Sequence, residues 1–96
     1  MKVIYDEVPE VILPKHITQL ALMKRFTRAE RDAIRAAESS DGDVSDIMFL
    51  FNTARYIDLE RQDTIDSINA FEAKTLIGVG RALEVLSAPV QNIERP

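Results

Sequence analysis

His16 carries the side chain whose type most readily does chemistry, because imidazole titrates near neutral pH and is a common metal ligand. The chain has one histidine and no cysteine, so His16 has no second imidazole or thiolate with which to share a metal ion. It also has no serine in a strained nucleophile turn on which to act as a base. We therefore expect His16 to lie at a helix start, facing solvent or a neighbour, and we predict no metal site and no catalytic residue.

The carboxylates and glycines also fall short of known sites. Paired acids such as Asp63 and Asp66 are usually turn and cap residues. The segment Asp41-Gly42-Asp43 lacks the ligand spacing and terminal glutamate of a calcium loop. Gly78-Val79-Gly80 lacks the third glycine and the preceding strand of a dinucleotide-binding turn. We therefore predict a protein that is not an enzyme and that takes no cofactor.

Arginines provide a basic pattern within residues 16–38, a segment that looks superficially like a helix-turn-helix. Arg28, Arg31 and Arg35 are spaced by three and four residues and so share one helical face, and Arg25 ends the preceding helix. A DNA-binding regulator is therefore the alternative function. An arginine-lined helix is more often a solvated or ion-pairing surface, so we expect these four arginines to contact a protein partner and do not expect nucleic acid.

The net charge of −4 is divided unevenly along the 96 residues. Residues 1–14 have one lysine against three acids, a net of −2, and residues 15–38 have six basic groups against three acids, a net of +3. Residues 39–96 have five basic groups against ten acids, a net of −5. Alternating zones of this kind favour ordered docking on charged partners, including other copies of the chain.

Composition is that of one globular domain, with 46% hydrophobic and 29% charged residues. The absence of cysteine excludes a disulfide scaffold. No apolar run approaches the roughly 20 residues that span a bilayer, and the N-terminus lacks the apolar core of a secretion signal. We expect a soluble protein made inside the cell, with no membrane partner.

Apolar side chains occur in both terminal segments, where prolines disfavour helix. Pro9 and Pro14 predict an extended arm over residues 1–15, and Pro89 predicts a tail over residues 88–96. Extended apolar segments commonly add to a neighbour's sheet or groove, although folding back onto its own domain is equally expected for the tail. We predict that the arm and tail bind a partner through Val3, Tyr5, Val8, Val11, Ile12, Leu13, Val90 and Ile93.

Between the tails, residues 16–87 have helical periodicity and predict an all-α bundle of four to five short helices. The helices are expected at about 16–26, 27–38, 44–56, 63–73 and 76 or 78 to 87, with a capping box of Thr27 and Glu30 starting the second. Tyr56–Leu59 is expected to be a connector. The apolar positions expected to face inward are Ile17, Leu20, Ala21, Leu22, Met23, Ala29, Ala33, Ile34, Ala37, Ile47, Met48, Leu50, Phe51, Ala54, Ile65, Ile68, Phe71, Val79, Ala82, Leu83, Val85 and Leu86.

Three runs of sequence resemble a family of small proteins of tailed bacteriophages. They are RFTRAERDAI (residues 25–34), ARYIDLERQDTIDSINAFEA (54–73) and GRALEVLSAPVQNIERP (80–96). The resemblance covers residues 17–96. One departure is Lys74-Thr75, where relatives tend to have glycine before the last helix. The helix junction there is therefore expected to form differently.

The resemblance implies a role in the phage particle, because members are encoded among virion structural genes toward the tail end. The expected function is a non-enzymatic structural or adaptor protein that docks between tail or head–tail junction subunits. The implied partners are tail, tail-fibre or portal and adaptor subunits, contacted by several copies of the chain in a symmetric virion. The expected location is the virion, after synthesis in the host cytoplasm.

Overall fold

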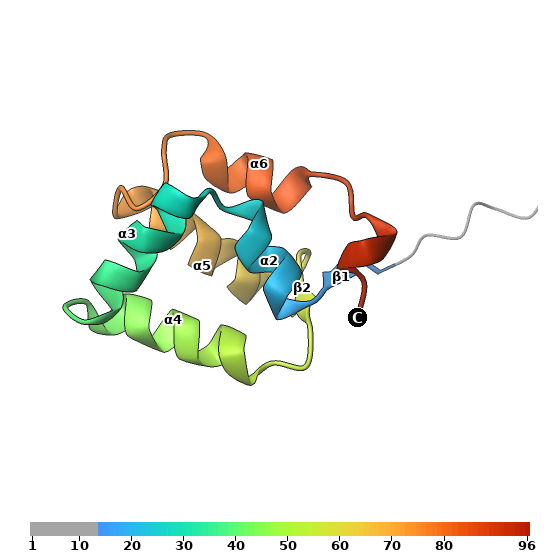
Figure 1. Cartoon of the computed structure of the whole chain (residues 1–96), viewed down its shortest axis with the longest axis horizontal. Coiled ribbons are helices and arrows are strands. Elements are labelled where there is room, and N and C mark those ends of the chain that lie inside the picture. The colour runs from blue at the N-terminus through green and yellow to red at the C-terminus, as the bar shows by residue number, and fades with distance from the viewer. Residues whose placement is uncertain (1–13) are drawn as a thin grey trace, which may run out of the picture.

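The helical periodicity corresponds to five α-helices in the computed structural model, which describes residues 14–96 (Figure 1). Helix α6 lies along one side of the domain and α4 along the other, with α2, α3 and α5 between them (Figure 1). The predicted all-α class is confirmed. The helices are α2 (Gln19–Arg25), α3 (Arg28–Glu38), α4 (Gly42–Thr53), α5 (Gln62–Ala73) and α6 (Arg81–Ser87), followed by the 3-10 turn η1 (Asn92–Glu94).

Side-chain caps fix where the helices begin. The predicted capping box is present at α3, since the Glu30 N–H donates to Thr27 Oγ1 at 3.1 Å and the Thr27 N–H donates to Glu30 Oε1 at 2.8 Å. Asp41 caps α4 by accepting from the N–H of Asp43 at 3.0 Å. Because this cap lies inside the predicted turn, α4 begins two residues earlier than expected.

A two-residue sheet, absent from the prediction, joins the start of the domain to its middle. Strand β1 (His16–Ile17) pairs antiparallel with β2 (Ile57–Asp58), which lies in the predicted connector. The His16 ring stacks on Tyr56 with 4.1 Å between ring centroids. Helix α2 therefore starts at Gln19 with Thr18 as its cap, and the expectation that His16 lies at a helix start is wrong.

The core forms where all five helices meet the sheet. Phe26 and Phe71 contact edge to face at its centre, with 6.1 Å between ring centroids. Phe26 ends α2, so the short turn into α3 is anchored by a buried aromatic ring rather than exposed. The other fully buried large side chains are Ile17, Leu22, Ile68, Val44 and Val85.

Several apolar positions predicted to face inward are exposed. Leu20, Ala29, Leu50, Val79 and Leu83 all face solvent among the described residues, and Val79 is 99% exposed. The reason for Val79 is that α6 begins only at Arg81, after Gly80 at φ 85°, so Val79 lies in the preceding loop. For the other four, the buried face of each helix is narrower than the apolar stripe in the sequence.

Helix α5 ends in a Schellman motif that has threonine where glycine is usual. The Leu76 N–H donates to the Phe71 carbonyl at 2.9 Å, and the Thr75 N–H donates to the Glu72 carbonyl at 3.0 Å. This geometry requires a left-handed residue, and Thr75 adopts φ 61°. A β-branched residue is strained there because its Cβ crowds the backbone. The departure at Lys74-Thr75 is therefore one of residue type. Thr75 itself takes the left-handed backbone conformation that glycine favours.

We predict that Thr75→Gly stabilises the domain. Removing the strained Cβ should raise the free energy of unfolding by about 1 kcal/mol, or the melting temperature by about 4–8 °C for a domain of this size. Thermal unfolding followed by circular dichroism measures the change. The control is Ala73→Gly, which lies in the helix and should destabilise. A lower melting temperature for Thr75→Gly would contradict the strain argument.

Candidate interaction surfaces

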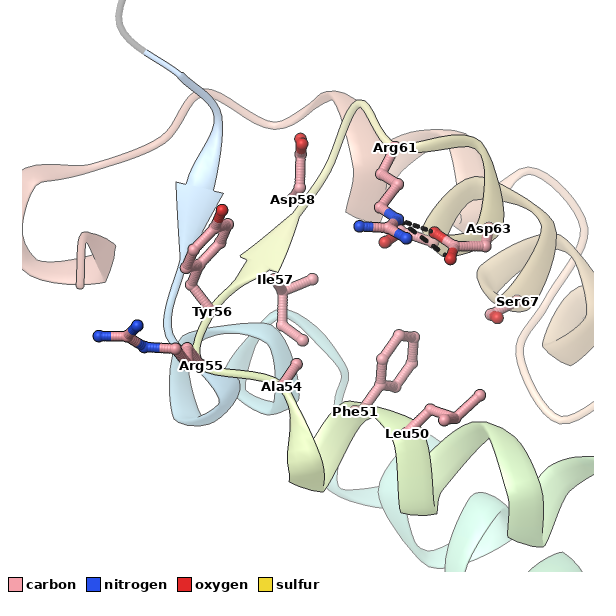
Figure 2. Close-up of a pocket in the computed structure, with 11 residues that line it drawn as sticks. Leu50, Phe51, Ala54, Arg55, Tyr56, Ile57, Asp58, Arg61, Asp63 and Ser67 are labelled. Carbon is pink, nitrogen blue, oxygen red and sulfur yellow. Dashed lines mark hydrogen bonds and ion pairs between the residues drawn. The ribbon is translucent and has the colours of Figure 1, made fainter.

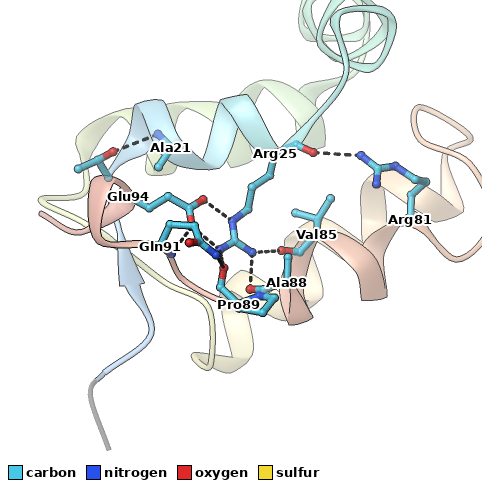
Figure 3. A network of polar contacts seen from close by, with 9 residues as sticks. Ala21, Arg25, Arg81, Val85, Ala88, Pro89, Gln91 and Glu94 are labelled. Carbon is cyan, nitrogen blue, oxygen red and sulfur yellow. Dashed lines mark hydrogen bonds and ion pairs between the residues drawn. The ribbon is translucent and has the colours of Figure 1, made fainter.

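Arg25 lies in a network that fastens the C-terminal tail to α2, which we call the tail clasp: Arg25, Glu94 and the carbonyls of Val85 and Ala88 (Figure 3). The guanidinium donates to both Glu94 carboxylate oxygens at 2.9 Å and to the two carbonyls at 2.7 and 2.9 Å. Its side chain is only 6% exposed. Arg25 is therefore not available to a partner, and its predicted binding role is corrected to an internal one.

The tail after α6 folds back rather than extending away. The Thr18 N–H donates to the Glu94 carbonyl at 2.8 Å, and Arg95 donates to the Pro14 carbonyl at 3.2 Å. Val90 is partly buried against the core, so it makes an internal contact, and its predicted partner-binding role stays a prediction. Ile93 differs, because its side chain is 92% exposed on the turn η1. The tail thus holds one predicted contact residue inward and presents the other to solvent.

A second arginine links α6 to α3 through the capping box. Arg81 donates from Nε and Nη2 to the two carboxylate oxygens of Glu30, both at 2.8 Å, and from Nη2 to the Arg25 carbonyl at 3.0 Å. Hydrogen bonding to Arg81 holds the pKa of Glu30 below its usual value. Arg25 lowers the pKa of Glu94 in the same way.

The remaining arginines of the predicted basic face also have intramolecular partners. Arg31 donates to the carbonyls of Met23 and Phe26, at 3.2 and 2.6 Å. Arg28 and Arg35 are exposed and both pair with Asp32, at 3.5 and 2.8 Å. Arg28 and Arg35 therefore remain accessible to a partner, whereas Arg31 helps to close the turn between α2 and α3. No contact here favours the DNA-binding alternative.

The predicted contact residues of the N-terminal arm lie outside the described part of the chain. They are Val3, Tyr5, Val8, Val11, Ile12 and Leu13. Pro14 is the first described residue, and it lies at the same end of the domain as the C-terminus (Figure 1).

A shallow hollow opens between the end of α4, strand β2 and the start of α5 (Figure 2). Its volume is about 420 Å³. Leu50, Phe51 and Ile57 form its apolar part, and Arg61 on its rim pairs with Asp63 at 2.9 Å. Its polar lining residues are Arg55, Tyr56, Asp58, Arg61, Asp63, Thr64 and Ser67. Asp58 also lies 3.7 Å from His16, which is outside the lining. The apolar part of the hollow can accept an apolar side chain.

The outer face of α4 presents two large hydrophobic side chains. Phe49, which the sequence analysis did not single out, is 65% exposed, and its neighbour Leu50 is also exposed. The position of Phe49 around the helix could have indicated its exposure, because it lies about opposite the buried Val44, Met48 and Phe51. The described residues expose seven large hydrophobic side chains in all: Leu20, Phe49, Leu50, Tyr56, Val79, Leu83 and Ile93.

Within residues 14–96 no group of three or more histidine, aspartate or glutamate side chains could hold a metal ion. The helices of this part are all too short or too polar to cross a membrane. Comparison of the chain with protein-family models, with curated proteins and with solved structures found no match.

We predict that Arg25→Met lowers the free energy of unfolding by about 2 kcal/mol, because it leaves the Glu94 charge and two carbonyls without their donor. The matched control is Arg28→Met, whose exposed ion pair should contribute less than about 0.5 kcal/mol. Urea unfolding followed by circular dichroism measures both. Equal losses for the two variants would show that the tail clasp contributes no more than a surface pair.

Low pH should reduce the stability of the domain by protonating Glu30 and Glu94. Because the folded-state pKa values of Glu30 and Glu94 lie below the ordinary value of 4.5, their stabilisation is complete above that pH and is lost as the pH falls through the folded values. We predict that Glu94→Gln is less stable than the native chain at pH 7 and that the two urea midpoints converge at acidic pH. A constant difference between the midpoints at every pH would contradict this prediction.

Proposed function

We propose that the protein is a non-enzymatic structural adaptor of a tailed-phage virion, where it docks between tail or head–tail junction subunits. The phage context comes from the sequence resemblance of residues 17–96 to small tailed-phage proteins. The observation that carries a docking role is Ile93, an apolar side chain 92% exposed on an ordered turn. An isolated exposed side chain needs no explanation, but one held in place by the tail clasp is preorganised for contact.

Three contacts hold the turn that presents Ile93. Glu94, its next neighbour, pairs with Arg25 and accepts the Gln91 N–H at 2.9 Å, and its carbonyl accepts the Thr18 N–H at 2.8 Å. A partner that binds Ile93 therefore meets a surface whose conformational entropy has already been lost on folding. This lowers the entropic cost of docking.

The position of Pro14 beside the same turn also supports a docking role. Because Arg95 donates to the Pro14 carbonyl, Pro14 lies beside this turn. A subunit docked on Ile93 would thus lie near the residue at which the predicted arm joins the domain. Two adjacent contacts on one partner bind more tightly than either alone, because the second becomes intramolecular.

The proposal predicts that purified phage particles contain the protein and that Ile93→Asp reduces its incorporation. Particles made by the phage or prophage genome that carries the gene should be analysed by quantitative mass spectrometry, with the variant supplied in place of the native chain. We expect at least about a tenfold loss, equivalent to about 1.4 kcal/mol of binding. Absence of the native protein from particles would refute the virion role.

The control for this experiment is Val79→Asp. Val79 is equally exposed, at 99%, but lies in the loop before α6, at the end of the domain away from η1 (Figure 1). Both variants should keep the native melting temperature, because neither side chain is packed. If the two variants were incorporated equally, the protein would still be a component of the particle, but docking through Ile93 on the C-terminal tail would be refuted.

A further inference from the structure

We propose that α4 is a dimerisation helix that packs antiparallel against α4 of a second copy of this chain. The inference concerns a different surface from the tail and does not depend on the virion role. It rests on the exposed face of α4 and on the charges at the two ends of that face.

Helix α4 has large apolar side chains on its outer side as well as on its inner side. From Ile47 to Ala54 it has no charged residue, and its inner side is covered by the core. Its outer side presents Asp46, Phe49, Leu50 and Thr53, all of which are exposed. These positions follow the i, i+3, i+4, i+7 spacing of a helix-packing stripe. Phe49 and Leu50 form the apolar part of this stripe, and they are an adjacent pair of large exposed hydrophobic side chains that a partner helix could cover.

Opposite charges flank the stripe and indicate what the partner is. Asp46 lies on α4 before Phe49, and Arg55 follows Ala54, the extended residue that caps the other end of the helix. Neither residue takes part in the ion pairs formed between described residues. Figure 2 shows the Arg55 side chain extending away from the other residues of the hollow.

A second copy in the antiparallel direction satisfies both charges at once. A two-fold axis near Leu50 would bring Asp46 of each copy opposite Arg55 of the other, and would place the two Phe49 rings close to the axis. The parallel direction would instead place like charges together. The chain is therefore complementary to itself in the antiparallel orientation, and a two-fold axis closes that arrangement as a dimer.

The small area of this surface determines how tightly the dimer is expected to associate. One stripe of a 12-residue helix is smaller than the roughly 800 Å² per partner of a standard interface. Leu50 and Tyr56 extend it toward the mouth of the hollow. We expect a reversible dimer with a dissociation constant on the order of 10 µM.

Sedimentation velocity of the full chain from about 1 to about 500 µM tests the dimer, which should have twice the 10.8 kDa mass of the chain. Phe49→Asp should weaken the dimer at least about tenfold, whereas Leu83→Asp, on α6 at the opposite side of the domain, should not (Figure 1). A chain that stays monomeric over this range, or a dimer unaffected by Phe49→Asp, would overturn the proposal.

Charge reversal tests the orientation. Asp46→Arg alone and Arg55→Asp alone should each weaken the dimer through like-charge contacts, and the double variant should restore it. Restoration excludes simple loss of folding as the cause of weakening. Because the native chain has no cysteine, Phe49→Cys adds a further measurement: oxidation should link two copies across the axis, whereas Leu83→Cys should not. Failure of both the rescue and the cross-link would refute the antiparallel arrangement.

Discussion

The domain depends on carboxylates that cap a helix or turn and bind a distant cation at the same time. Glu30 closes the capping box of α3 and holds Arg81 of α6, and Glu94 caps η1 and holds Arg25 of α2. Asp41 caps α4 and accepts Lys74, which follows α5, at 2.8 Å. Each acid thus fixes a local turn and a tertiary contact together. Such coupling suits a small domain, whose core alone contributes limited stability.

The local half of this scheme could be read from the sequence. The capping box of Thr27 and Glu30, the five helices and most inward positions follow from spacing within a few residues. The tertiary half could not, because Arg25 and Glu94 are 69 positions apart and Arg81 and Glu30 are 51 apart. Nothing in local spacing chooses among the many possible partners of an arginine. The same is true of His16, whose pairing with Asp58 across β1 and β2 involves only two residues of each strand.

The predicted contact residues show the same difference between what local spacing indicates and what the tertiary structure decides. Sequence spacing identified Arg25, Arg28, Arg31 and Arg35 as a basic group, but the fold uses Arg25 and Arg31 internally and leaves Arg28 and Arg35 at the surface. Phe49 was neither among the positions predicted to face inward nor among the predicted contact residues. Only the packing of α4 shows which side of that helix the core covers.

The wide sequence separation of the tail clasp has a consequence for the order of folding. Contacts between distant parts of a chain are costly to form until the intervening elements have compacted. The segment from Pro89 onward is also synthesised after all five helices, so the clasp closes on elements that have already been made. The turn with Ile93 is therefore displayed only by a finished domain. A partner that recognises this turn would select completed molecules and pass over folding intermediates.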